Sequence, residues 1–141
     1  MATLNFNTDS SEMKVLIVDD IPLNVLLIQE MLSPFNFKLF KAGNGQTALD
    51  IIEKEQPDLV LLDLMMPGMS GYDVLKTVRE TKDMNTLPIV ILSALNSNDD
   101  VVKGFSLGAN DFITKPVIMQ RLHNCVTTQL NLLLAHRHLN A

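Results

Sequence analysis

Five short apolar runs, separated by segments with helical periodicity, constrain what this chain can fold into. The runs lie at residues 14–18, 37–42, 58–62, 87–92 and 111–113. They are continuously apolar instead of alternating, which is typical of parallel strands covered on both faces. Helical spacing of apolar residues follows each run, over residues 23–32, 46–55, 71–81, 98–107 and 117–137. The sequence therefore predicts an α/β fold, a (βα)5 doubly wound parallel five-stranded sheet.

Length and composition favour one folded domain. The chain has 141 residues, of which 47% are hydrophobic and 19% are charged. These values are typical of a single globular domain and exclude disorder as the main state. We expect a flexible N-terminal arm over residues 1–12, a globular domain over residues 13–135, and a C-terminal tail or the start of a signalling helix over residues 136–141.

Charge and cysteine content exclude several function classes. The formal net charge of −5 argues against direct nucleic-acid binding. Cys125 is the only cysteine, which excludes an internal disulfide and a cysteine-rich zinc site. The apolar runs are too short to cross a membrane, and residues 1–12 lack the basic and apolar blocks of a secretion signal. We therefore expect a cytoplasmic protein that has no membrane segment.

Polar residues follow four of the five predicted strands. Asp19 and Asp20 come after the first run, Asp63 after the third, Ser93 after the fourth and Lys115 after the fifth. Ligands of open parallel sheets bind beyond the carboxyl ends of the strands, so we expect these side chains to share one edge. Each residue alone is compatible with an ordinary turn or helix cap. Their joint placement is what indicates a functional site.

Three carboxylates at one edge imply a bound cation. Two unit charges about 5 Å apart repel by about 3 kcal/mol at an effective dielectric constant of about 20. Oxygen ligands without histidine or cysteine suit Mg²⁺ better than zinc. Together with the Lys115 ammonium group and the Ser93 hydroxyl group, such a cation would surround a phosphoryl group carried by one of the carboxylates.

Four segments carry a specific resemblance to a known family. They are VLIVDD at 15–20, LVLLDLMMPGMSG at 59–71, PIVILSA at 88–94 and GANDFITKPV at 108–117. Over about residues 13–135, the chain resembles the CheY-like receiver domains of response regulators in bacterial two-component systems. The resemblance implies a flavodoxin-like fold with the strand order 2-1-3-4-5.

The same resemblance implies roles for the acidic residues. Asp63 matches the phosphoacceptor, and Asp19 and Asp20 match the acidic pair that holds Mg²⁺ directly or through water. The family's third protein contribution to the metal is a backbone carbonyl two residues after the acceptor. In this chain that carbonyl belongs to Met65.

Three further positions match the family's switch machinery. Ser93 matches the switch hydroxyl, and Lys115 matches the phosphate-binding lysine, which similar domains join to Pro116 by a cis bond. Phe112 stands at the aromatic switch position, which is more often Tyr, and its plainer role would be packing on the last helix. Gly104 lies inside the fourth predicted helix and weakens it by about 1 kcal/mol, so we expect that helix to be a two-state element.

The expected function is that of a phosphorylation-activated receiver in a phosphorelay. A histidine kinase or a histidine phosphotransfer protein would phosphorylate Asp63 with Mg²⁺, and the face formed by residues 98–107, 111–113 and 117–137 would switch. Such a domain is an acceptor with slow autodephosphorylation and not a turnover enzyme. The family tunes phosphoryl loss at two positions that are apolar here, Met65 and Leu95, so we expect a long-lived phosphorylated state. The alternative is a degenerate or fragment receiver that acts only as a partner-binding or dimerisation module.

Two other classes with related architecture fit less well. A phosphotransferase of the haloacid-dehalogenase type needs a second acid two residues after its nucleophile, where this chain has Met65. A flavodoxin-like nucleotide or flavin binder needs a Gly-rich or Ser/Thr-rich phosphate loop after the first strand. Asp19 and Asp20 occupy that place and would repel a phosphate.

The last predicted helix carries two apolar stripes. The first, which we expect to pack on the sheet, consists of Leu122, Val126, Leu130 and Leu133. The second recurs every seven residues and consists of Ile118, Cys125, Leu132 and Leu139. It predicts a homodimer or a fused output domain bound through the last helix, or else a wider buried face. Cys125 stands where the winged-helix branch of the family has a pairing arginine, so we do not expect that ion-paired dimer.

Overall fold

The chain folds around one parallel sheet of five strands. The structure, a computed structural model, describes residues 12–140, so all of the expected N-terminal arm except Glu12 lies outside the described residues. The strands are β1 (Lys14–Val18), β2 (Lys38–Ala42), β3 (Leu59–Leu62), β4 (Ile89–Ser93) and β5 (Asp111–Thr114). All neighbouring strands are parallel, in the order β2-β1-β3-β4-β5. The predicted doubly wound, flavodoxin-like architecture is confirmed.

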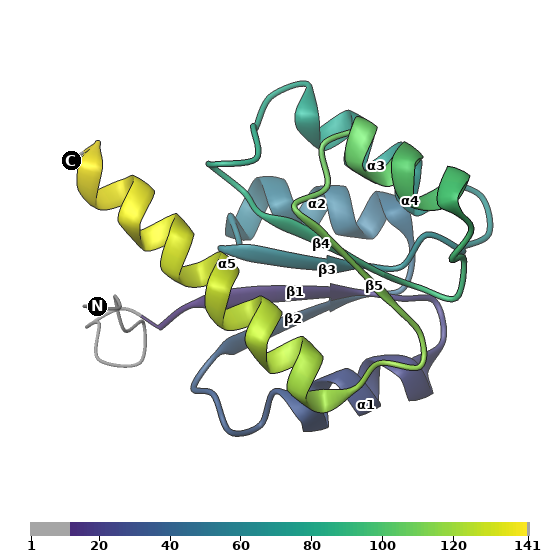
Figure 1. Ribbon diagram of the computed structural model, residues 1–141, viewed down its shortest axis with the longest axis horizontal. Coiled ribbons are helices and arrows are strands. Elements are labelled where there is room, and N and C mark those ends of the chain that lie inside the picture. Colours follow the sequence, from purple (N-terminus) through teal and green to yellow (C-terminus); the bar gives the residue numbers. More distant parts are fainter. Residues whose placement is uncertain (1–11, 141) are drawn as a thin grey trace.

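Five helices cover the two faces of this sheet (Figure 1). They are α1 (Pro22–Met31), α2 (Gly45–Glu55), α3 (Gly71–Arg79), α4 (Asn98–Ser106) and α5 (Met119–Leu139). Helices α1 and α5 lie on one face, and α2, α3 and α4 lie on the other. Because a helix carries the chain back after every strand, the carboxyl ends of all strands meet at one edge. Within residues 12–140, no helix has the length and apolar character that crossing a membrane requires.

Strand β1, which lies between β2 and β3, sends alternate side chains into two separate apolar layers. Val15 and Ile17 pack with residues of α1 and α5, whereas Leu16 and Val18 pack with residues of α2 and α3. Side chains of a strand point to opposite faces in turn, so a strand between two helical layers is apolar at every position. All residues of β3 are likewise buried, and each such side chain contributes roughly 1.5–3 kcal/mol to stability.

The last helix starts later than the sequence pattern predicts. It begins at Met119 instead of residue 117, because Ile118 keeps extended backbone angles (φ −94°, ψ 127°) at the cap position. The helix then continues to Leu139, so residues 136–139 of the expected tail or signalling helix are helical and belong to α5. An ion pair of 2.7 Å between Arg137 and Asp58 ties this last part of α5 to the start of β3.

The second apolar stripe of the last helix is divided between the core and the solvent. The first stripe is buried on the sheet as predicted, at Leu122, Val126, Leu130 and Leu133. Cys125 is also buried, and its thiol donates a hydrogen bond to Asp111 Oδ2 at 3.2 Å. Leu132 and Leu139 are 59% and 82% exposed. The prediction of an interaction surface that includes Cys125 is therefore wrong, because this side chain points towards β5.

Candidate functional site

The carboxyl edge of the sheet brings together the residues that the sequence singled out. Strands β1 and β3 pair directly, so Asp19 and Asp63, which follow them, lie side by side. The sequence predicted that Ser93 directly follows the fourth strand. In the structure, Ser93 is the last residue of β4. Lys115 follows β5, and its backbone N–H donates to the Ser93 carbonyl at 2.8 Å. Residues far apart in the sequence therefore share one site.

Asp19, Asp20 and Asp63 form a close carboxylate cluster. One oxygen of each lies within 4.8 Å of the others. Asp19 and Asp63 are buried, and Asp20 is partly buried. The Oδ1 atom of Asp20 is buried without a hydrogen-bond partner among the described residues. A buried carboxylate oxygen without a donor is costly, so the cluster fits a ligand that the protein itself does not supply.

Lys115 offsets part of this negative charge. Its Nζ atom lies 2.8 Å from Asp19 Oδ2 and 3.7 Å from Asp63 Oδ2. One ammonium group faces three carboxyl groups, so negative charge remains after this pairing. A hard divalent cation that prefers oxygen ligands matches both the donor atoms and the remaining charge. The three carboxylates are therefore suited to hold Mg²⁺.

Burial raises the pKa of the Asp63 carboxyl above its usual value. Lys115 opposes the rise, as does the N–H of Met65, which donates to Asp63 Oδ1 at 3.3 Å. The charges of Asp19 and Asp20 raise the pKa further. A cation in the cluster would favour the ionised carboxylate. Positive charge around Asp63 thus favours the ionised form of its carboxyl group.

Two residues that the sequence analysis missed orient Asp19. The N–H of Ile21 donates to Asp19 Oδ1 at 2.9 Å, and the side-chain amide of Asn24 lies 3.5 Å from the same oxygen. A carboxylate that accepts from the backbone two residues later forms an Asx turn. Pro22 begins α1 directly after this turn. An aspartate shortly before a helix-starting proline is the sequence signal that could have identified this support.

Ser93 and Phe112 lie at the border between the site and α4. Ser93 is fully buried, and its Oγ atom accepts the N–H of Leu95 at 3.1 Å. Its hydroxyl oxygen is thus engaged by the loop that follows β4. Phe112 is 8% exposed and belongs to the apolar layer of α2, α3 and α4. The expectation that Phe112 packs on the last helix is wrong, because its side chain lies on the α4 face of the sheet.

Two backbone features bring neighbouring segments close to the cluster. The Lys115–Pro116 peptide bond is cis, as the resemblance implied. Gly71, the first residue of α3, lies so near β3 that an added Cβ would collide with the backbone oxygen of Asp63. Its N–H donates to the Leu64 carbonyl at 3.0 Å. A glycine at this position is what lets α3 begin directly against the end of β3.

Comparison with known proteins identifies the family of this site. The family described as the response regulator receiver domain matches residues 15–127. This chain belongs to the response regulator receiver family. The response regulator PleD of Caulobacter vibrioides is 38% identical over 104 residues, which cover 74% of this chain and 23% of PleD. The receiver chain thus spans about a quarter of the length of such curated relatives.

Solved receiver structures agree with this assignment. Chemotaxis protein CheY4 of Vibrio cholerae has a TM-score of 0.78 and 27% identity, covering 85% of this chain and 100% of CheY4. The CheX–CheY–BeF3–Mg²⁺ complex of Borrelia burgdorferi gives a TM-score of 0.77 and 27% identity, covering 82% of this chain and 87% of that one. The carboxylate cluster of this receiver domain is therefore the natural place to look for its activity.

Proposed function

We propose that Asp63 accepts a phosphoryl group from a phosphohistidine of a histidine kinase or a histidine phosphotransfer protein. An oxygen of Asp63 forms the new bond to phosphorus while the P–N bond to the donor imidazole breaks, and the imidazole takes up a proton as it leaves. The observation that carries the proposal is a buried Asp63 that lies 3.7 Å from Lys115 beside two further carboxylates.

Mg²⁺ would supply charge neutralisation when bound. We propose that Asp19, Asp20, Asp63 and the backbone carbonyl of Met65 hold it. The partnerless buried oxygen of Asp20 supports this ligand set. The BeF3 and Mg²⁺ named in the Borrelia burgdorferi CheY complex are consistent with it.

The phosphorylated carboxylate needs new partners, and we propose that Lys115 and Ser93 provide them. An aspartyl phosphate carries a charge of about −2, so the Lys115 ammonium group moves from its pair with Asp19 towards the phosphoryl oxygens. The Ser93 hydroxyl group donates to the same oxygens. Because Ser93 Oγ accepts the N–H of Leu95, a movement of the Ser93 side chain pulls the loop between β4 and α4. The face of α4, β5 and α5 then switches.

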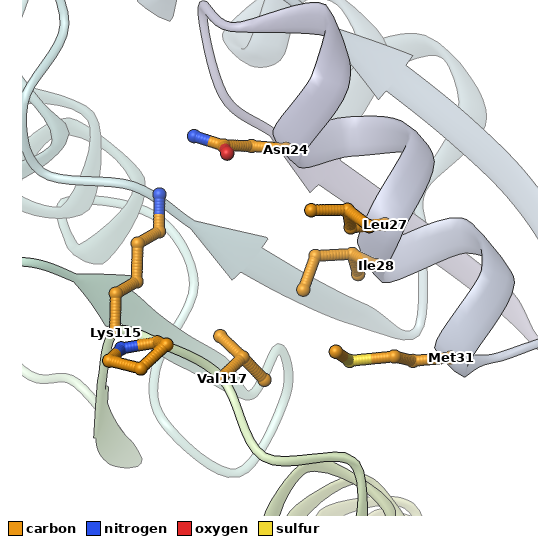
Figure 2. Close-up of a pocket in the computed structure, with 7 residues that line it drawn as sticks. Asn24, Leu27, Ile28, Met31, Lys115 and Val117 are labelled. Carbon is orange, nitrogen blue, oxygen red and sulfur yellow. The ribbon is translucent and has the colours of Figure 1, made fainter.

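Apolar side chains around the acidic cluster favour a protein as the phosphodonor. Exposed ones include Ile21, Leu23, Leu26 and Leu27 at the start of α1 and just before it, and Met65 after β3. A groove of about 390 Å³ lies between α1 and the segment after β5. In Figure 2, Leu27, Ile28 and Met31 lie on one side of this groove and Val117 lies on the other. Lys115 stands at one end of this groove. Apolar patches beside a charged site mark protein interaction surfaces, so the donor would dock here while its phosphohistidine reaches Asp63.

Phosphoryl transfer can be tested with acetyl phosphate and with a phosphohistidine protein. We expect wild-type protein with Mg²⁺ to gain one hydroxylamine-sensitive phosphoryl group, and Asp63→Asn to gain none. Asp50→Asn, the same change at an exposed position of α2, should be labelled like wild type. A label that persists in Asp63→Asn would refute the acceptor assignment. Absence of a label in the wild type with both donors would favour a module that only binds partners.

The exposed part of α5 is the proposed second partner surface. Leu132 and Leu139 lie seven residues apart and are both exposed. We propose that they support a homodimer or contact with a fused output domain, as PleD is much longer than this chain. Leu132→Glu should abolish dimers in sedimentation experiments with little loss of thermal stability. A wild-type chain that remains monomeric at high concentration would exclude the homodimer.

A further inference from the structure

Helix α4 is attached to α3 at both of its ends, by different chemistry at each end. Near its start, the Tyr72 hydroxyl donates to the Asp100 carbonyl at 3.1 Å, and Lys103 Nζ lies 4.3 Å from the centroid of the Tyr72 ring. Just beyond its end, Arg79 Nε donates to the Gly108 carbonyl at 2.9 Å. Figure 1 shows these two helices over the same face of the sheet. The two attachments differ greatly in how readily they can open.

The attachment at the end of α4 is built to stay closed. The Arg79 guanidinium group also donates to the carbonyls of Lys82, Asp83 and Leu87 and to Asn110 Oδ1, at 2.8–3.2 Å. Burial lowers its pKa to about 10, which still leaves it charged at neutral pH. Gly108 has a φ of +101° and an added Cβ there would meet Arg79 at 3.0 Å. A partly buried cation with this many acceptors is costly to release.

The attachment near the start of α4 consists of one neutral hydrogen bond and one cation–π contact. Burial raises the pKa of Tyr72 above its usual value, so its hydroxyl group stays protonated and able to donate. Lys103 is exposed, and an exposed cation–π contact is weak. Opening this end costs far less than opening the Arg79 end.

The contact between α4 and the sheet offers little resistance to movement. Gly104 is the one residue of Asn98–Ser106 that is buried. An added Cβ at this glycine would lie 2.8 Å from Ile91 Cδ1 and 3.3 Å from Phe112 Cδ2, so bare backbone rests on these two side chains. Val102 and Phe105 are exposed on the outer face. A helix with so few buried apolar contacts has low local stability.

We propose that Tyr72 is a latch that holds α4 in the resting state, and that α4 pivots about its Arg79-bound end when the latch opens. The proposal rests on the proposed function, because phosphorylation of Asp63 is what draws on the loop before α4. The latch opposes that pull, so it lowers the population of the switched state until the phosphoryl group is in place. The first turns of α4 would then move relative to α3, and the residues that α4 exposes to solvent would change.

The test uses Tyr72→Phe in the full, unphosphorylated chain. This variant keeps the ring and loses the hydroxyl group. Amide hydrogen exchange at residues 101–104 should accelerate by roughly two- to tenfold, the range expected for one net hydrogen bond, while residues 107–110 stay unchanged. Lys103→Gln should accelerate the same amides by a smaller factor. Arg79→Lys is the matched control at the other end and should accelerate residues 107–110.

A second measurement connects the latch to the switch. Binding of beryllofluoride with Mg²⁺, a phosphoryl analogue, should tighten by the same factor in Tyr72→Phe, because less energy is spent on opening the latch. Unchanged exchange at residues 101–104, or equal acceleration along the whole of α4, would overturn the proposal. If beryllofluoride does not bind the wild type at all, the proposed function fails, while the exchange experiment still decides on the latch.

Discussion

At the scale of one residue, Gly71 shows how the absence of a side chain lets α3 begin close to Asp63. An added Cβ would meet the backbone of Asp63 and Leu64, which cannot move aside as a flexible side chain would. We expect Gly71→Ala to lower the free energy of unfolding by about 3 kcal/mol. Gly43→Ala, where nothing lies within 4 Å of the added Cβ, should change it by less than about 1 kcal/mol. Urea denaturation of both variants measures the difference, and equal effects would contradict this account.

Met65 and Leu95 are predicted to prolong the life of the phosphorylated state. The Met65 side chain, two residues after Asp63, is 54% exposed, and Leu95, two residues after Ser93, is partly buried. Polar groups at these two places could orient an attacking water, whereas apolar ones hinder it. Met65→Asn combined with Leu95→Glu should therefore speed phosphoryl loss by about tenfold, which corresponds to about 1.4 kcal/mol in the barrier.

The decay is followed after removal of the phosphodonor. Met84→Asn, which changes another exposed methionine away from the site, should decay like the wild type. A double variant that decays at the wild-type rate would show that the two apolar side chains do not shield the phosphoryl group.

At the scale of elements, Asp111 joins β5 to α5. It accepts hydrogen bonds from both terminal nitrogens of Arg121, at 3.2 and 3.1 Å, and from the thiol of Cys125 at 3.2 Å. Burial alone would raise the pKa of Asp111, but these donors and the N–H of Phe112 outweigh it, so the pKa is lowered. The carboxylate is thus satisfied within the chain and needs no arginine from a second copy.

The Asp111–Arg121 pair predicts a specific pH dependence. A depressed folded-state pKa contributes stability above the ordinary value of 3.8, and this contribution is lost as the pH falls through the folded value. Because Arg121 is exposed, Arg121→Gln should cost only about 0.5–1 kcal/mol at pH 7 and less below pH 4. Denaturation at several pH values measures this. An equal loss at pH 7 and pH 3 would mean that Arg121 acts by packing and not by charge.

At the scale of the whole molecule, the carboxylate cluster predicts that Mg²⁺ stabilises the folded chain. The ion would relieve repulsion that exists only when Asp19, Asp20 and Asp63 are brought together by folding. A ligand at one hundred times its Kd adds about 2.7 kcal/mol, which raises the melting temperature by several degrees. Thermal melts with and without Mg²⁺ measure the shift.

Asp20→Asn removes the carboxylate whose buried oxygen lacks a partner, and it should lose most of the Mg²⁺-dependent shift. Asp50→Asn on the exposed side of α2 should keep it. A wild-type melting temperature that does not respond to millimolar Mg²⁺ would contradict a metal site in the cluster.

The sequence by itself determined the architecture and the edge of the sheet that carries the site. A continuous apolar run such as Leu59–Leu62 is readable as a doubly covered strand because burial on both faces leaves no polar position. The carboxyl ends of parallel strands must share one edge, so Asp19, Asp63 and Lys115 were predictable as neighbours before any distance was known. These inferences need only local periodicity and one topological rule.

Only the tertiary structure decided which side chains face one another across segments. Cys125 fits an exposed heptad stripe by spacing, yet it packs in the apolar layer of α1 and α5, and its thiol donates to Asp111 on β5. Gly104 reads as a weak point of a helix, but packing makes it the place where bare backbone rests on the sheet. Tyr72 carries no signal at all, because its partner, the Asp100 carbonyl, lies on another helix. Contacts of this kind depend on distances between remote segments, which periodicity along the chain does not encode.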